Sequence, residues 1–108
     1  MPDLEVRPYS TAVGAEVLGV DLAHPLDTAT LATIQDAFHK HLVLFFRDQT
    51  LTPEQQIAFS QHFGDLEEYP FVQGIDGYPE LIEIVKTPDE VLNFGHDWHA
   101  DMTYREQP

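Results

Sequence analysis

The stretch Leu42-Val43-Leu44-Phe45-Phe46 is the longest continuous apolar run in the chain. An apolar run without polar alternation predicts a strand that is buried on both faces. An amphipathic helix is expected directly before it, because Asp27 is a good N-cap and apolar residues then recur every three or four positions. The apolar stripe of that helix consists of Leu31, Ile34, Phe38 and Leu42. Arg47, which follows the apolar run, is expected in a surface ion pair with Asp48.

A second helix is expected after the apolar run. Thr52 fits its N-cap, Pro53 its first turn, and Gln55 the third position of a capping box. Gly64 suits the position just after the helix end, where a left-handed backbone is common. The residues expected to point inward are Ile57, Ala58 and Phe63.

Further strands are expected toward the two ends of the chain. Leu4 to Tyr9 and Ala15 to Leu22 predict a small hairpin, while Glu80 to Lys86 and Trp98 to Tyr104 have the composition of strands. A loop with one short extended piece, Tyr69 to Val72, is expected before them. This order favours an α+β fold in which helices cover one side of an antiparallel sheet. The spacing of the strands does not suggest a series of β-α-β units.

The composition limits the size and the partners of the chain. Its 108 residues are enough for one domain, and 43 % hydrophobic content can fill a core. Nineteen acidic against five basic residues give a net charge of −14, which argues against nucleic acid and anionic membranes as partners. The oligomeric state, a homo-oligomer included, is left open.

The sequence also bears on the cellular compartment. It contains no cysteine, so disulfides and thiolate metal sites are excluded. Residues 1–5 lack the basic region and apolar run of a signal peptide, and no apolar run approaches the roughly 20 residues that span a bilayer. A soluble, cytoplasmic protein is the expectation.

His99 and Asp101 are candidate metal ligands. On a strand, residues two apart project from the same face, so an imidazole and a carboxylate would share one space, with Ala100 and Met102 opposite. Such a pair resembles part of the 2-His-1-carboxylate triad of non-haem Fe(II) oxygenases. The alternative is a histidine and an aspartate that bond only to each other or to the backbone. Trp98 is expected to pack beneath the pair.

Four blocks in a fixed order resemble the taurine dioxygenase (TauD/TfdA) family of Fe(II)- and 2-oxoglutarate-dependent dioxygenases. The resemblance spans roughly Val6 to Pro108. The blocks are Gly14 to Leu22, His41 to Gln49 leading into Leu51 to Gln55, Phe59 to Leu66, and Trp98 to Tyr104.

The resemblance implies a mainly β fold, a double-stranded β-helix (jelly roll) with flanking helices, of which residues 1–108 would be the N-terminal portion of a single catalytic domain. It implies that His99 and Asp101 are two of three Fe(II) ligands. The third ligand, a distal histidine, and the arginine that binds 2-oxoglutarate would lie downstream of Pro108. The implied reaction is hydroxylation of a small organic substrate by O2, with oxidative decarboxylation of 2-oxoglutarate. The isolated 108-residue chain is expected to be inactive.

The substrate is expected to differ from taurine. Family members that act on taurine carry a substrate-binding histidine and tyrosine where this chain has Tyr69 and Val72. Asn93 and His96 lie in the loop before the ligand pair and are candidate substrate contacts, although polar loop residues often only face water.

Two other functions remain open from the residues alone. The chain could act without a metal, as a fragment or association module that completes its sheet with another chain. Histidine and aspartate also suit Zn²⁺ in a hydrolytic site. A downstream histidine and arginine would favour the dioxygenase over both.

Overall fold

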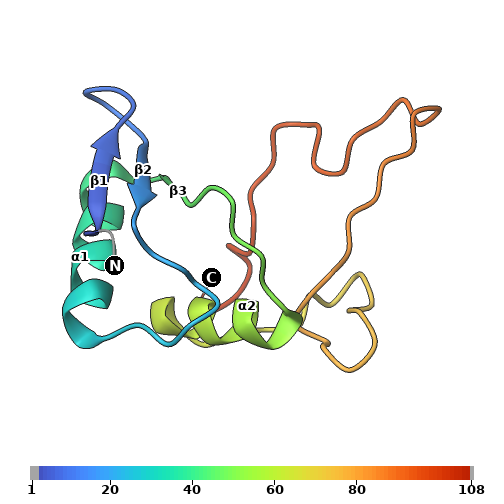
Figure 1. The fold of residues 1–108 in the computed structure, drawn as a ribbon. Coiled ribbons are helices and arrows are strands. Elements are labelled where there is room, and N and C mark those ends of the chain that lie inside the picture. The colour runs from blue at the N-terminus through green and yellow to red at the C-terminus, as the bar shows by residue number, and fades with distance from the viewer. Residues whose placement is uncertain (1–2, 108) are drawn as a thin grey trace. The chain divides into compact units, whose positions relative to one another are not determined.

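The computed structural model describes residues 3–107. The chain divides into two compact units, which are residues 1–67 (the N-terminal unit) and residues 68–108 (the C-terminal unit). The N-terminal unit holds the regular secondary structure, which Figure 1 shows as a hairpin, a helix, a short strand and a second helix. No helix among the described residues has the length and apolar content needed to cross a bilayer.

The N-terminal hairpin confirms the prediction. Strands β1 (Glu5–Pro8) and β2 (Ala15–Leu18) pair antiparallel, with Val6 opposite Val17. Ser10 stabilises the connecting loop, because its Oγ accepts from the backbone N–H of Val13 at 3.0 Å. The second strand stops at Gly19, where φ is +79° and an added Cβ would collide with backbone atoms of Asp3. Gly19 therefore ends the strand.

Helix α1 (Thr28–His41) begins as predicted, because the Asp27 carboxylate accepts from the backbone N–H of Thr30 at 2.7 Å. Strand β3 (Leu44–Phe45) follows α1 and pairs with β2 in parallel, so the sheet order is β1-β2-β3. The expectation of an antiparallel sheet is therefore wrong for the β2–β3 pair, which α1 joins as a single β-α-β unit. The pairing is parallel because α1 carries the chain back to the end of the sheet at which β2 began.

The apolar run 42–46 is only partly a strand. Two of its residues belong to β3, and Phe45 and Val43 are exposed rather than buried on both faces. The strand is short because β3 lies at the edge of the described sheet and pairs on one side only. The apolar stripe of α1 is likewise buried in its first half alone, since Ile34 is 0 % exposed whereas Phe38 and Leu42 are exposed.

The core of the N-terminal unit is small and lies between the sheet and α1, which contacts β2 and β3. Its buried apolar residues are Ala15, Val17, Leu22, Ile34 and Ala37.

Helix α2 (Pro53–Ser60) has the predicted start. The Thr52 hydroxyl accepts from the backbone N–H of Gln55, and the Gln55 side chain accepts from the N–H of Thr52 at 2.9 Å. A 3₁₀ turn, η1 (Gln61–Phe63), extends the helix to Gly64, whose φ is +145°. The inward face differs from the prediction. Ile57 is half-buried as expected, but Ala58 and Phe63 are exposed, and Phe59 packs edge-to-face on Phe46 at 5.6 Å.

The C-terminal unit contains turns and extended segments but no helix or strand within residues 68–107. The strands expected at 80–86 and 98–104 are not formed in this structure, and helical residues outnumber strand residues among those described. A strand needs a partner for its backbone groups, and the described residues provide none here. Backbone hydrogen bonds define a turn around residues 74–81, in which Ile75 donates to Leu81 at 2.8 Å and Tyr78 donates to Ile75 at 2.9 Å.

Candidate functional site

Two consecutive turns lead into the candidate ligand pair. Glu90 donates to the carbonyl of Thr87 at 3.1 Å, and the Thr87 hydroxyl lowers the pKa of the nearby Asp89 carboxyl. His96 then donates from its backbone to the carbonyl of Asn93 at 3.2 Å. His99 and Asp101 follow these turns on an irregular segment that forms no strand.

The side chains of His99 and Asp101 face each other. Nε2 of His99 lies 3.1 Å from Oδ1 of Asp101, and Nδ1 of His99 lies 2.7 Å from the carbonyl oxygen of Asp97. A carbonyl only accepts hydrogen bonds, so Nδ1 carries the proton in this contact. In the neutral imidazole, Nε2 therefore presents its lone pair toward the carboxylate. A backbone carbonyl that fixes the tautomer in this way is a common support for a metal-bound histidine.

A lone pair and a carboxylate oxygen 3.1 Å apart repel unless a proton or a metal cation lies between them. In the absence of metal the proton is favoured. The pKa of His99 is raised above its ordinary value of 6.5, first by the hydrogen bond to the Asp97 carbonyl and then by the charge of Asp101. The donor set thus fits a cation.

The pair is open to solvent and forms only part of a metal site. The side chains of His99 and Asp101 are 53 % and 86 % exposed. No third histidine, cysteine, aspartate or glutamate in the described part of the chain completes a metal-binding group with them. A bound ion would therefore need at least one more protein ligand.

The pair opens into a hollow of about 630 Å³ within the C-terminal unit. Apart from the pair itself, the side chains that form its walls are apolar or aromatic. They include Tyr69, Phe71, Ile82, Phe94, Met102 and Tyr104. This volume lies in the range of small-molecule pockets.

The surroundings of the pair differ from the strand-based prediction. Ala100 and Met102 line the same hollow as His99 and Asp101 instead of lying on the opposite side, because this segment forms no strand and its side chains do not alternate between two faces. Trp98 is fully exposed and does not pack beneath the pair.

The two predicted substrate contacts lie near the pair but outside this hollow. Nδ1 of His96 contacts the carbonyl of Asn93 at 3.0 Å, and its Nε2 lies 3.2 Å from the Asp97 carboxylate. Both residues line a neighbouring hollow with Phe94. Their role as substrate contacts stays a prediction.

Sequence reasoning missed a polar cluster in the N-terminal unit. Arg47 binds Glu16 at 3.1 Å and donates to the Tyr9 hydroxyl at 2.8 Å, so the expected pairing with Asp48 is wrong. The hydrogen bond to Tyr9 and the charge of Glu16 raise the pKa of the Arg47 guanidinium, which remains charged. The partners are far apart in sequence, and no local signal reveals them.

Gln49 is a second residue that sequence reasoning missed. Its side-chain oxygen accepts from the backbone N–H of Leu22 at 2.8 Å. Its amide nitrogen donates to the carbonyls of Val20 at 3.0 Å and Arg47 at 3.2 Å. Gln49 therefore fastens the segment after β2 to the segment after β3.

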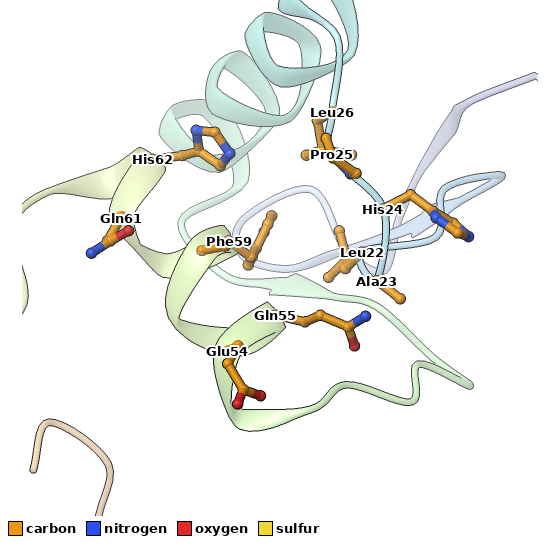
Figure 2. A pocket seen from close by; sticks show the side chains of 11 residues that line it. Leu22, Ala23, His24, Pro25, Leu26, Glu54, Gln55, Phe59, Gln61 and His62 are labelled. Carbon is orange, nitrogen blue, oxygen red and sulfur yellow. The ribbon is translucent and has the colours of Figure 1, made fainter. Parts of the chain in front are cut away.

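A separate hollow of about 520 Å³ lies in the N-terminal unit. Figure 2 shows the segment from Leu22 to Leu26 on one side and α2 on the other. His24 and His62 are both at this hollow, but the described residues there form no metal-binding group.

The sequence of the chain matches a known protein family. The family model described as taurine catabolism dioxygenase TauD, TfdA family matches residues 5–108. An alpha-ketoglutarate-dependent sulfate ester dioxygenase from Pseudomonas putida is 36 % identical over 105 residues, which are 96 % of this chain and 34 % of the relative. An (S)-phenoxypropionate/alpha-ketoglutarate-dioxygenase from Sphingobium herbicidovorans is 38 % identical over 106 residues, 95 % of this chain and 37 % of the relative. The chain thus spans about a third of the length of these curated relatives.

Solved structures of related proteins support the same family assignment. A taurine dioxygenase from Burkholderia xenovorans superposes with a TM-score of 0.67 at 43 % identity, over 72 % of this chain and 28 % of that one. The structure of AAD-2 in complex with Mn(II) and N-oxalylglycine gives a TM-score of 0.58 at 36 % identity, over 61 % of this chain and 24 % of that one. The resemblance found in the four sequence blocks is confirmed, and the chain belongs to the taurine catabolism dioxygenase TauD, TfdA family.

Proposed function

We propose that this chain is the N-terminal part of an Fe(II)- and 2-oxoglutarate-dependent dioxygenase, with His99 and Asp101 as two of its three iron ligands. The observation that carries the proposal is the 3.1 Å approach of His99 Nε2 to Asp101 Oδ1 in the lining of a largely apolar hollow. Family membership and relatives named as alpha-ketoglutarate-dependent dioxygenases support it. The complex of AAD-2 with Mn(II) and N-oxalylglycine supports a metal and a 2-oxo acid as the co-reactants.

Each residue of the pair has a separate task in this proposal. His99 supplies a neutral nitrogen donor whose orientation the Asp97 carbonyl holds at 2.7 Å. Asp101 supplies the negative charge and a hard oxygen donor. When bound, Fe(II) supplies the redox chemistry that couples decarboxylation of 2-oxoglutarate to hydroxylation of the substrate by O2.

The proposed substrate is a small organic anion other than taurine. One relative is named for sulfate esters, another is named an alkylsulfatase, and a third is named for phenoxypropionate. All three names indicate molecules that combine an anionic group with an apolar alkyl or aryl part. The aromatic walls of the hollow suit that apolar part.

We further propose that residues 1–108 contribute to one jelly-roll domain. The similarity to taurine dioxygenase structures supports this architecture. The segments 80–86 and 98–104 would become strands when other strands of the domain supply their hydrogen-bonding partners.

The test is succinate release from 2-oxoglutarate by the intact protein with Fe(II), O2 and an alkyl sulfate. His99→Ala and Asp101→Ala should each lower turnover by about 100-fold or more, since even the loss of a residue supporting a metal ligand costs roughly 10- to 100-fold. Asp89→Asn is the matched control, because Asp89 lies in the preceding turn and is bonded to Thr87. Turnover by both ligand variants at the level of the control would contradict the proposal.

A further inference from the structure

The turn that precedes the ligand pair lies beside the ring of His99. The backbone N–H of His96 closes this turn by donating to the carbonyl of Asn93 at 3.2 Å. Gly95, the third residue of the turn, has a φ of +69°, and a type II turn requires a positive φ at this position. A Cβ added to Gly95 would lie 3.5 Å from Cε1 of His99. The shape of the turn therefore bears on the position of the His99 ring.

The side chain of His96 joins this turn to the next residue. Its Nδ1 donates to the Asn93 carbonyl at 3.0 Å, since a carbonyl only accepts hydrogen bonds. Its Nε2 lies 3.2 Å from Oδ2 of Asp97. One imidazole thus contacts the start of the turn with one nitrogen and the side chain of Asp97 with the other.

Asp97 is the residue that holds the ring of His99. It lies at a bend outside any helix or strand, so no ladder of backbone hydrogen bonds fixes the direction of its carbonyl. That carbonyl nevertheless accepts from Nδ1 of His99 at 2.7 Å. The contacts therefore form one series, which runs from the turn through His96 and Asp97 to the ring of His99.

We propose that His96 is a positioning residue for the metal ligand His99, because its contact with the Asp97 side chain holds the Asp97 carbonyl in the direction that orients the ligand ring. The inference rests on the proposed function for the identity of His99 as an iron ligand. It gives His96 an effect on metal binding, whereas the substrate contact predicted from the sequence would affect binding of the organic molecule. A ring held in one orientation presents Nε2 to the metal, so loss of His96 should weaken metal binding before any substrate is present.

The experiment measures Mn(II) binding to the intact protein from the EPR signal of free Mn(II), without 2-oxoglutarate or substrate. His96→Ala should weaken Mn(II) binding by about five- to tenfold, at or below the roughly 10- to 100-fold cost of losing a direct partner of a metal-bound histidine, because the Asp97 carbonyl remains. His96→Gln should restore part of the affinity, since its amide nitrogen can donate to the Asp97 carboxylate. His24→Ala is the matched control and should leave the affinity unchanged, because it breaks a similar histidine–aspartate contact, 3.4 Å to Asp21, in the other unit.

A double-mutant cycle tests whether His96 acts through Asp97. Asp97→Ala keeps the backbone carbonyl but removes the carboxylate that His96 contacts, so it should also weaken Mn(II) binding. The double variant should then bind Mn(II) no more weakly than the weaker of the single variants, because two residues that act through one contact are not additive. Losses that add would show two independent effects, such as the loss of a negative charge near the metal, and would overturn the inference.

The glycine of the turn gives a second test. Gly95→Ala places a Cβ at a φ of +69°, so the turn must shift, and Mn(II) binding should weaken. Gly77→Ala is the matched control, because Gly77 has a φ of +81° but an added Cβ there meets no heavy atom of the described residues within 4 Å. Both variants should lower the urea midpoint alike, so a difference in Mn(II) affinity reports the position of the turn beside His99.

Two further results would overturn the inference. One is equal Mn(II) affinity of His96→Ala and His24→Ala. The other is a His96→Ala enzyme that has a raised KM for an alkyl sulfate but unchanged Mn(II) affinity, which would make His96 a substrate contact. Failure of the proposed function gives a different pattern, in which His99→Ala itself binds Mn(II) as tightly as the parent.

Discussion

Gln49 offers the sharpest test of how the N-terminal unit is held together. In the Gln49→Leu variant, three hydrogen bonds to Leu22, Val20 and Arg47 disappear while the side-chain volume is kept. The backbone N–H of Leu22 then lacks its acceptor in a residue that is only 7 % exposed. An unsatisfied buried donor costs about 1–3 kcal/mol, and each of the other two bonds contributes about 0.5–1.5 kcal/mol. The expected loss in free energy of unfolding is about 3 kcal/mol.

Urea denaturation monitored by circular dichroism measures this loss. With a slope of about 2 kcal/mol per molar urea, the midpoint should fall by about 1.5 M. Gln49→Glu separates the contributions, because it keeps the acceptor for Leu22 but removes both donors, and an intermediate midpoint is expected. Gln56→Leu makes the same change on the exposed side of α2 and should shift the midpoint little. Equal midpoints for Gln49→Leu and Gln56→Leu would refute the bridging role.

Two further predictions concern the core and the ligand pair. Ile34→Ala should lower the free energy of unfolding by about 3 kcal/mol, because Ile34 is 0 % exposed. Leu42→Ala, at a 59 % exposed position, should cost much less. Equal losses in urea denaturation would contradict the observed core. The His99 imidazole of the metal-free protein should titrate above pH 6.5 by NMR, with the protonated form stabilised at low pH and that stabilisation lost as the pH rises through the raised pKa. Asp101→Asn should lower the pH midpoint of the His99 titration, while the hydrogen bond from His99 to the Asp97 carbonyl remains. An unchanged pH midpoint would argue against the observed pairing of His99 with Asp101.

The parts of the fold that follow from local chemistry could be predicted. Asp27 and Thr52 cap their helices as expected, since the capping atoms are within three residues of the groups they bind. Pairing over a longer distance could not. The parallel alignment of Ala15 with Leu44 depends on how α1 packs, and no pattern within either strand specifies it.

In the candidate site, too, local features could be predicted from the sequence and long-distance features could not. The two-residue spacing of His99 and Asp101 correctly suggested that they would meet, although they lie on an irregular segment rather than on a strand. The aromatic walls come from segments more than twenty residues apart, such as Phe71 and Phe94, and sequence reasoning pointed instead to the polar Asn93 and His96. Ligand spacing is a local property, whereas the composition of a pocket is a tertiary one.

The two edges of the small sheet differ in their capacity to pair with a further strand. The outer strand β1 ends in Pro8, which has no N–H to offer to another strand, whereas the outer edge of β3 carries no proline. The backbone groups of β3 at this edge are therefore the ones that can accept another strand.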